Sequence, residues 1–326
     1  MKRIVIAAVC MVLLINSTAM ARTFISVGTN PVGMALYTMG AGIADVVGRE
    51  IPEIDFTVEA TKGGIHNLYL MGLGDLEFAF TAPGAALQAY KGEGIYQKAV
   101  PVLGMFSHQI AYQQLPALKD SSIAKIADIE NKRIGVGPPG SLARADNFKY
   151  LTASGFERDD FEAFSETLPE MAEKMKNGQL DAAMWFGAIP LAPLMDLAQT
   201  RELNWVPANE AKLKRLLKEN PMYFITDLPA NTYPGQTQAV RSLAYRHNFV
   251  ARADVPEELV YKMMKTIFGN LDDLGKVHRG WRVTSFDTAL QSMSIPLHPG
   301  AIRYFREAGH PDIEEFVRAM NKKFSN

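Results

Sequence analysis

Cysteine is almost absent from this chain, because its 326 residues contain only Cys10. Disulfides therefore contribute nothing to its stability, and a chain of this length buries a full core without them. Basic residues do not dominate either, since 34 Lys and Arg are balanced by 35 Asp and Glu with no basic block. This balance argues against nucleic acid or an anionic membrane surface as a partner. No apolar run after residue 21 reaches the ~20 residues that span a bilayer, so we expect no stable membrane insertion of the mature chain.

Metal, nucleotide and nucleophile motifs are also missing. The six histidines are scattered, without i, i+4 spacing or a carboxylate cluster, so neither a metal site nor a cofactor is predicted. Residues 28–33 fit G-x-x-x-x-G, but Met34 and Ala35 occupy the positions where a phosphate-binding loop needs Lys and Ser or Thr. There is no G-x-S-x-G, and Ser141 has no base near it in the sequence. These absences favour binding over catalysis, although a distant histidine and acid assembled in space would still permit an enzyme.

The first 21 residues have the parts of a secretory signal peptide. Lys2 and Arg3 form a positive region, residues 4–15 an apolar core, and residues 19–21 an A-x-A cleavage site. We therefore expect cleavage after residue 21 and a mature protein in the periplasm; an uncleaved membrane anchor is the alternative. Removing Lys2 and Arg3 from the 34 basic residues leaves 32 against 35 acidic ones, a net charge of −3.

Short strands that alternate with helices predict an α/β fold built from parallel βαβ units. In such sheets, ligands bind beyond the carboxyl ends of the strands. Three strand ends of the first half are expected to meet at one crevice, at residues 28–33, 61–64 and 81–84. A second series is predicted further on, with strands at 133–137 and 181–186 and a helix at 142–154. Towards the C-terminus, helices are predicted at 256–268, 271–278, 284–293 and 300–308.

Two long extended stretches, at residues 100–115 and 239–251, are predicted to cross between two lobes. The length of the mature chain also fits two domains. Lobe 1 is predicted to comprise residues 22–115 and 245–326, and lobe 2 residues 116–244. The expected architecture is therefore a hinged pair of α/β lobes.

Two loops have the design of an anion site, in which a strand runs through a glycine-containing turn into the start of a helix. Unpaired amides and the positive end of the helix dipole attract small anions there. One loop follows Gly28, and the other lies at Ser141, a natural N-cap. Arg144 offers a guanidinium to a carboxylate, although an ordinary exposed helix arginine is the simpler interpretation. The residues expected to contact a ligand are Asn30, Val32, Gly33, Met34, Tyr37, Thr81, Gly84, Ser141, Arg144, Phe186 and Gly187.

Several segments together resemble the TAXI family of substrate-binding receptors of tripartite ATP-independent periplasmic (TRAP) transporters. The resemblance covers essentially the whole mature chain, and it depends on the order and spacing of these segments together. It implies a two-lobed periplasmic-binding-protein type II fold, with two crossover strands at the hinge, that closes around a small solute. The segments are GTNPVGMALYTMGAGIA, VEATKGGIHNLYLMGLGDLEFAF, SSIAKIADIENKRIGVGPPGS, NPMYFITDLPANTYPGQ, RADVPEELVYKMMKTIFGNLDDL and PLHPGAIRYFREAG.

The resemblance also implies partners and a ligand class. It implies delivery of the solute to TRAP membrane subunits, and we expect a monomer. Family ligands are mostly small carboxylates, such as glutamate-like amino acids and dicarboxylic acids. Val32 and Met34 replace a threonine and a glycine of the family's opening loop, and Leu142 and Ala143 a glycine and a threonine of the second loop. The expected ligand is therefore a small organic anion with an apolar body, or an amino acid such as glutamate. A sensor that feeds a receptor kinase and an enzyme on the same fold are the alternatives.

Overall fold

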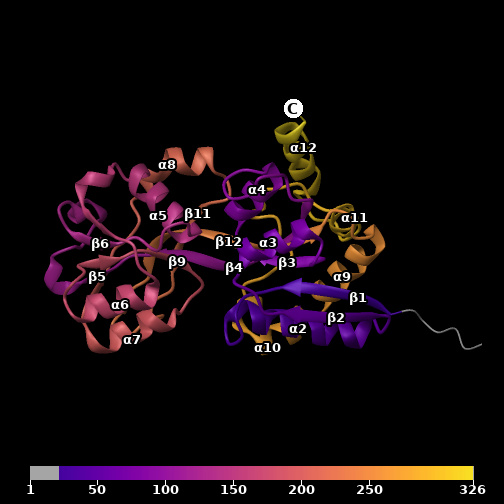
Figure 1. The fold of residues 1–326 in the computed structure, drawn as a ribbon, viewed down its shortest axis with the longest axis horizontal. Coiled ribbons are helices and arrows are strands. Elements are labelled where there is room, and N and C mark those ends of the chain that lie inside the picture. Colours follow the sequence, from indigo (N-terminus) through magenta and orange to yellow (C-terminus); the bar gives the residue numbers. More distant parts are fainter. Residues whose placement is uncertain (1–21, 326) are drawn as a thin grey trace, which may run out of the picture.

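The computed structural model describes residues 22–325, so the predicted signal peptide lies outside the described residues. Figure 1 shows two bodies that two long strands connect. We call them lobe 1, which contains strands β1 to β3, and lobe 2, which contains strands β5 to β8. Across residues 22–325, every helix is too short or too polar to cross a membrane.

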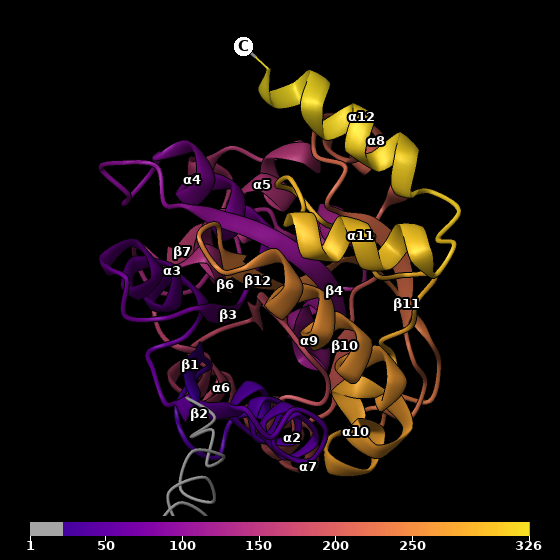
Figure 2. The ribbon, with the colours of Figure 1, turned by 90° about the vertical axis from the view of Figure 1, so that its right-hand side faces the viewer.

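Lobe 1 is built on three parallel strands, of which β3 is fully buried. The strands are β1 (Thr23–Gly28), β2 (Ile54–Glu59) and β3 (Phe78–Thr81), in the spatial order β2-β1-β3. Such strands need helices on both faces. Figure 2 shows α3 and α4 on one side of this sheet and α2, α9 and α10 on the other. The helices of this lobe are α2 (Ala35–Glu50), α3 (Gly64–Leu73), α4 (Pro83–Lys91), α9 (Glu257–Gly269), α10 (Leu271–Val277), α11 (Pro299–Glu307) and α12 (Ile313–Phe324).

Apolar spacing explains why these helices form where they do. In α2 the buried residues Leu36, Met39, Ile43 and Val46 follow the helical period and face the sheet. Gly42 allows α10 to approach this helix, because a Cβ there would lie 3.1 Å from a methyl carbon of Leu274.

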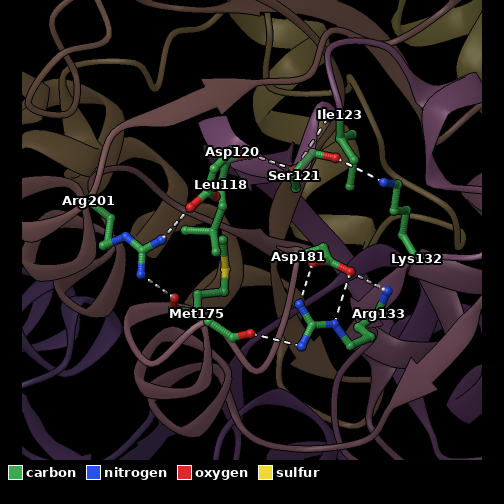
Figure 3. A network of polar contacts seen from close by, with 10 residues as sticks. Leu118, Asp120, Ser121, Ile123, Lys132, Arg133, Met175, Asp181 and Arg201 are labelled. Atoms are coloured by element: carbon green, nitrogen blue, oxygen red, sulfur yellow. Dashed lines mark hydrogen bonds and ion pairs between the residues drawn. The ribbon is translucent and has the colours of Figure 1, made fainter.

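Lobe 2 has its own smaller sheet, in the order β10-β5-β8-β6-β7. An ion pair supports the centre of that sheet: the Arg133 guanidinium donates to both carboxylate oxygens of Asp181, at 2.6 and 3.1 Å (Figure 3). The strands are β5 (Pro116–Leu118), β6 (Arg133–Gly135), β7 (Glu162–Phe164), β8 (Ala182–Ala183) and β10 (Leu203–Trp205). The helices are α5 (Leu142–Ala153), α6 (Leu168–Lys176), α7 (Ala192–Thr200) and α8 (Glu210–Glu219), with short 3-10 turns at Lys119–Ser121, Ile126–Ile129 and Arg158–Asp160 here and at Arg279–Trp281 in lobe 1.

The two lobes are joined by β4 (Val102–Gln114) and β12 (Val240–Arg252), which pair antiparallel over most of their length. One end of each strand packs in the core of lobe 1, through Phe106 and Phe249, and the other end packs in lobe 2, through Ala111 and Leu243. Two short strands, β9 (Trp185–Gly187) and β11 (Phe224–Leu228), extend this pair on the side of lobe 2. The predicted α/β fold with two crossing strands is confirmed.

The strand predicted at 181–186 is wrong, because that segment contributes to two sheets. Residues 182–183 form β8 beside β6 in lobe 2, whereas residues 185–187 form β9 beside β4. Met184 makes the transition and is fully buried, and its amide donates to the Gly135 carbonyl at 2.8 Å. A continuous apolar run cannot reveal such a change of partner, because both short strands are buried.

The helix predicted at 284–293 is also wrong, because this segment forms turns. Its backbone serves the edge of β4 instead: the Ala289 carbonyl accepts from the Ser107 amide at 2.7 Å. The apolar residues Leu290 and Met293 are nevertheless buried in the core of lobe 1. Hydrogen bonding to β4 therefore outweighs the helical spacing of these side chains.

Candidate functional site

A cavity of about 240 Å³ lies between the lobes. Lobe 1 contributes the beginnings of α2, α3 and α4, lobe 2 contributes the beginning of α5, and the crossing strand β12 forms one wall (Figure 1). Two of the three strand ends predicted to meet at one crevice, 61–64 and 81–84, line this cavity, and the third, 28–33, is followed by Leu36 of α2, which also lines it. The lining residues are Leu36, Lys62, Gly64, Ile65, Thr81, Ala82, Leu142, Tyr245 and His247.

A buried asparagine holds the three strand ends of lobe 1 together. The Asn67 side-chain amide donates to the carbonyl of Thr29, after β1, at 2.8 Å and to that of Phe80, in β3, at 2.9 Å. Its side-chain oxygen accepts from the hydroxyl of Thr61, which follows β2. Because Asn67 is fully buried, each of these bonds satisfies a group that water does not reach. The relative positions of the three loops are therefore set by one side chain.

The beginning of α3 carries the positive character of the cavity. The Thr61 hydroxyl accepts from the amide of Gly63 at 3.0 Å. The next three amides, at residues 64–66, are the first of the helix and have no acceptor within the described part of the chain. Gly64 is needed there, since a Cβ would lie 2.9 Å from the Cα of Thr81. Lys62 adds an exposed ammonium to the same rim.

The opening loop contributes less to the cavity than expected. The Asn30 side-chain oxygen accepts from the Tyr37 amide at 2.9 Å, so it closes the first turn of α2. Val32 and Met34 are 69% and 55% exposed, and Gly33 adopts a positive φ of 85° between them. It is Leu36, rather than these residues, that lines the cavity. Ligand contacts by Asn30, Val32, Gly33, Met34 and Tyr37 stay predictions.

The second predicted loop reaches the cavity through Leu142. Ser141 is the N-cap of α5: its hydroxyl accepts from the Arg144 amide at 3.2 Å and donates to the Pro138 carbonyl at 2.8 Å. The guanidinium of Arg144 donates to the Gly137 carbonyl at 3.2 Å and to the Ser165 hydroxyl. It also covers the ring of Phe148. These contacts hold the Arg144 side chain within lobe 2, and direct ligand contacts by Ser141 and Arg144 stay predictions.

Aromatic rings form the wall on the side of lobe 2. Phe186 stacks on Tyr245 at 5.3 Å between ring centres, and Tyr223 lies 6.2 Å from both rings. The Tyr223 hydroxyl donates to the carboxylate of Asp146 at 2.7 Å. Burial raises the pKa of Asp146, since this carboxylate is only 5% exposed. Of these residues, only Tyr245 lines the cavity.

The remaining predicted contacts lie at or near the cavity. Thr81 lines it, and its hydroxyl donates to the Gly64 carbonyl at 3.3 Å. Gly84 lies at the beginning of α4, where a Cβ would be 4.0 Å from Met222 of lobe 2. Gly187 pairs with Tyr112 at the hinge. Contacts of Thr81, Gly84, Phe186 and Gly187 with a ligand stay predictions.

A histidine pair lies beneath the cavity. His247 lines it, and its ring stacks on that of His108 with 5.8 Å between the ring centres. Burial lowers the pKa of His247 to about 4, an effect that a hydrogen bond to the Thr81 backbone opposes only in part. The pKa of His108 is also lowered, by its complete burial and then by the charges of His247 and Arg246. Both rings are therefore neutral at neutral pH.

Of the residues that line the cavity, only Thr81 was among the predicted contacts. Sequence reasoning missed the others, which are Leu36, Lys62, Gly64, Ile65, Ala82, Leu142, Tyr245 and His247. Lys62 lies within residues 61–64, a strand end that was expected at the crevice, so the sequence did indicate its position. Tyr245 and His247 are two residues apart on a crossing strand, which places both side chains on one face. Nothing in the sequence says which face of that strand meets the cavity. Across residues 22–325, no three His, Cys, Asp or Glu side chains are grouped closely enough to hold a metal ion.

A family comparison covers most of the chain, since the NMT1-like family matches residues 27–309. The chain belongs to the NMT1-like family. The TAXI assignment is a finer one, and it stays a prediction.

Solved structures show the fold of this NMT1-like chain. The binding protein component of an ABC phosphonate transporter from Pseudomonas aeruginosa is 14% identical, with 93% of this chain and 98% of that one covered and a TM-score of 0.52. The periplasmic aliphatic sulphonate binding protein from Escherichia coli is 12% identical, with 93% and 91% covered and a TM-score of 0.51. The fold is thus that of periplasmic binding proteins, and these identities show the fold alone.

Proposed function

We propose that this chain is a periplasmic solute receptor of a TRAP transporter, which captures a small organic anion between its lobes and presents it to membrane subunits. The observation that carries the proposal is the cavity between the lobes, with the beginning of α3 on one side and that of α5 on the other. The fold supports it, because the solved structures that share this fold include periplasmic binding proteins of transporters. The TRAP partner is supported by the resemblance of the whole mature chain.

The charge of the cavity supports an anionic ligand. The unpaired amides at the beginning of α3 and the ammonium of Lys62 attract negative charge. None of the described residues that line the cavity is Asp or Glu. A carboxylate or sulfonate bound at α3 therefore meets no like charge in the lining.

The other lining residues support an apolar body on that anion. Leu36 and Ile65 from lobe 1, Leu142 from lobe 2 and the ring of Tyr245 present apolar surface. The volume of about 240 Å³ is below the ~300–1,000 Å³ of pockets for drug-sized ligands, so the solute is small. We therefore propose a monocarboxylate or monosulfonate with a short alkyl or aromatic body. Burying each CH₂ of that body contributes about 0.8 kcal/mol.

Closure of the lobes around the solute provides the signal to the membrane subunits. Leu142 belongs to lobe 2 and Ile65 to lobe 1, so a solute that touches both favours the conformation in which the lobes are close. The population shifts only by the difference in affinity between the open and closed forms. The ligand contacts predicted at Ser141 and in the opening loop belong to the closed form.

A thermal-shift series tests this function. Hexanoate, hexanesulfonate and benzoate should raise the Tm, whereas hexylamine should not, because an ammonium meets Lys62 and the positive helix end. A ligand at 100 times its Kd stabilises by about 2.7 kcal/mol, which shifts the Tm by several degrees. Glutamate tests the amino-acid alternative in the same plate.

Two lysine variants make the test specific to the cavity. K62Q removes the exposed ammonium at the rim and should weaken hexanoate binding by up to about fivefold, because an exposed ion pair contributes about 0.2–1 kcal/mol. K265Q is the matched control, because Lys265 is an exposed lysine of α9, on the opposite side of the lobe 1 sheet from α3. Tm shifts with hexylamine alone, or equal hexanoate affinity in both variants, would overturn the proposal.

A further inference from the structure

The histidine at the wall of the cavity has an unusual surrounding. His247 lines the cavity from β12, and its Nδ1 atom is buried without a hydrogen-bond partner within residues 22–325. The ring lies between two others, His108 at 5.8 Å and Tyr245 at 5.5 Å between ring centres. The ring is therefore held in place by stacking and by its hydrogen bond to the Thr81 backbone, and only its Nδ1 atom is unused by the fold.

The charged groups around His247 are all cationic or distant. Lys62 lines the same cavity from lobe 1, and Arg246 is the neighbour of His247 on β12. His108 faces the ring from β4. The carboxylate of Asp146 lies beyond Tyr245, where it accepts from Tyr223 and forms an ion pair with Lys149 at 3.4 Å. Without a bound anion, burial therefore favours the neutral form of His247.

We propose that His247 takes up a proton when the cavity binds an anion, so that solute capture and proton capture are coupled at one site. The inference rests on the proposed function, because it needs an anion in the cavity. The anion lies between Lys62 and His247, where its charge offsets the ammonium and attracts the imidazolium. The proton comes from solvent and is bound at a ring nitrogen of His247, with no other bond made or broken.

The coupling has a definite sign. Burial holds the pKa of His247 at about 4 in the empty cavity, and a bound anion raises it. Between these two pKa values, one proton enters with each anion, so affinity rises up to about tenfold for each pH unit lowered. At a pH above the pKa of the complex, affinity no longer depends on this group.

Hexanesulfonate is the probe for this coupling, because a sulfonate stays ionised throughout pH 5 to 8 and cannot itself supply the pH dependence. Titration calorimetry at pH 5.5 in two buffers of different ionisation enthalpy counts the protons taken up. The wild type should take up between about 0.5 and 1 proton for each anion, and its Kd should tighten about tenfold between pH 7.5 and pH 5.5.

Two variants assign the proton to its residue. H247Q places a side-chain amide of similar length at this position, and that amide does not titrate. The variant should therefore bind hexanesulfonate without proton uptake, and its affinity should not depend on pH. H66Q is the matched comparison, because His66 lies in the first turn of α3 but does not line the cavity. It should take up protons like the wild type. Measurements on the wild type alone stand even if H247Q folds poorly, since NMR of the histidine C2 protons follows the titration of His247 with and without the anion.

The outcomes separate this inference from the function on which it rests. Binding without proton uptake in the wild type overturns the coupling and leaves the receptor function intact. Uptake that persists in H247Q, or disappears in H66Q, overturns the assignment to His247. Failure of hexanesulfonate, hexanoate and benzoate to bind at any pH overturns the proposed function and the coupling with it.

Discussion

Acid should destabilise this protein through the histidine that lines its cavity. The pKa of His247 is about 4 in the folded chain, because burial disfavours the imidazolium, against about 6.5 for an exposed histidine. Between these values the unfolded state binds more protons than the folded state, so stability falls as the pH is lowered through this window. From pH 7 to pH 5, His247 alone should cost the ligand-free protein about 2 kcal/mol. Well above pH 6.5 this histidine is neutral in both states and no longer makes the stability depend on pH.

Two other buried groups modify the size of this loss. The pKa of His108 is lowered too, chiefly by burial, so its titration adds to the loss in the same direction. Asp146 acts in the opposite direction, because burial raises its pKa and the folded state then takes up a proton before the unfolded state does. The total therefore depends on several groups, whereas the difference between wild type and a His247 variant isolates one.

Urea unfolding at pH 7, 6 and 5 measures the effect without any ligand. The wild type should lose stability steadily below pH 6.5, and H247Q should lose about 2 kcal/mol less between pH 7 and pH 5. H66Q serves as the comparison and should follow the wild type. An H247Q curve parallel to that of the wild type would refute the reasoning, because the acid sensitivity would then come from other groups.

Three further predictions concern the framework around the site. N67A should cost about 2 to 4 kcal/mol in urea unfolding, because it removes two buried hydrogen bonds to the carbonyls of two strand ends; stability within 1 kcal/mol of wild type would contradict this. G300A should cost at least about 2 kcal/mol, since a Cβ there would lie 2.3 Å from the Glu257 carbonyl oxygen, whereas G269A, with open space around it, should be neutral. D181N should lower the Tm, because it removes the charged bonds to Arg133. Desolvation of Asp181 is outweighed by its bonds to Arg133, so its pKa is lowered, and the variant should match the wild type only at a pH low enough to protonate Asp181. A difference in Tm that stays the same at low pH would contradict this.

The elements that sequence reasoning recovered have strong local signals. The strand ends after β1 and β3, which run into glycine-containing turns, and the helix α9, which follows a proline, were all placed within a few residues. α12 was missed although its signal was present, because Ile313, Phe316, Val317 and Met320 follow the helical period. The errors at 181–186 and 284–293 are of another kind. In both, the local pattern was real but the backbone bonded to strands far away in the sequence.

The position of the candidate site could be predicted from the sequence, but its lining residues could not. That three strand ends meet at one crevice follows from parallel topology, and the cavity at the beginnings of α3 and α4 agrees with it. Which side chains line that cavity does not follow. Leu36 lines it rather than its neighbours Val32 and Met34, and Arg144 is held within lobe 2 by Gly137 and Ser165. A shift of one residue along a helix or strand turns a different side chain towards the cavity.

By itself, the sequence determined the α/β class, the two lobes and the two strands that cross between them, because these depend on local periodicity and on turn chemistry. Only the tertiary structure decided that His247 and Tyr245 face the cavity, that Asn67 joins three strand ends, and that one short segment serves two sheets. The physical reason is that hydrogen bonding and burial between distant segments select one face of each element. Local preferences do not distinguish those faces.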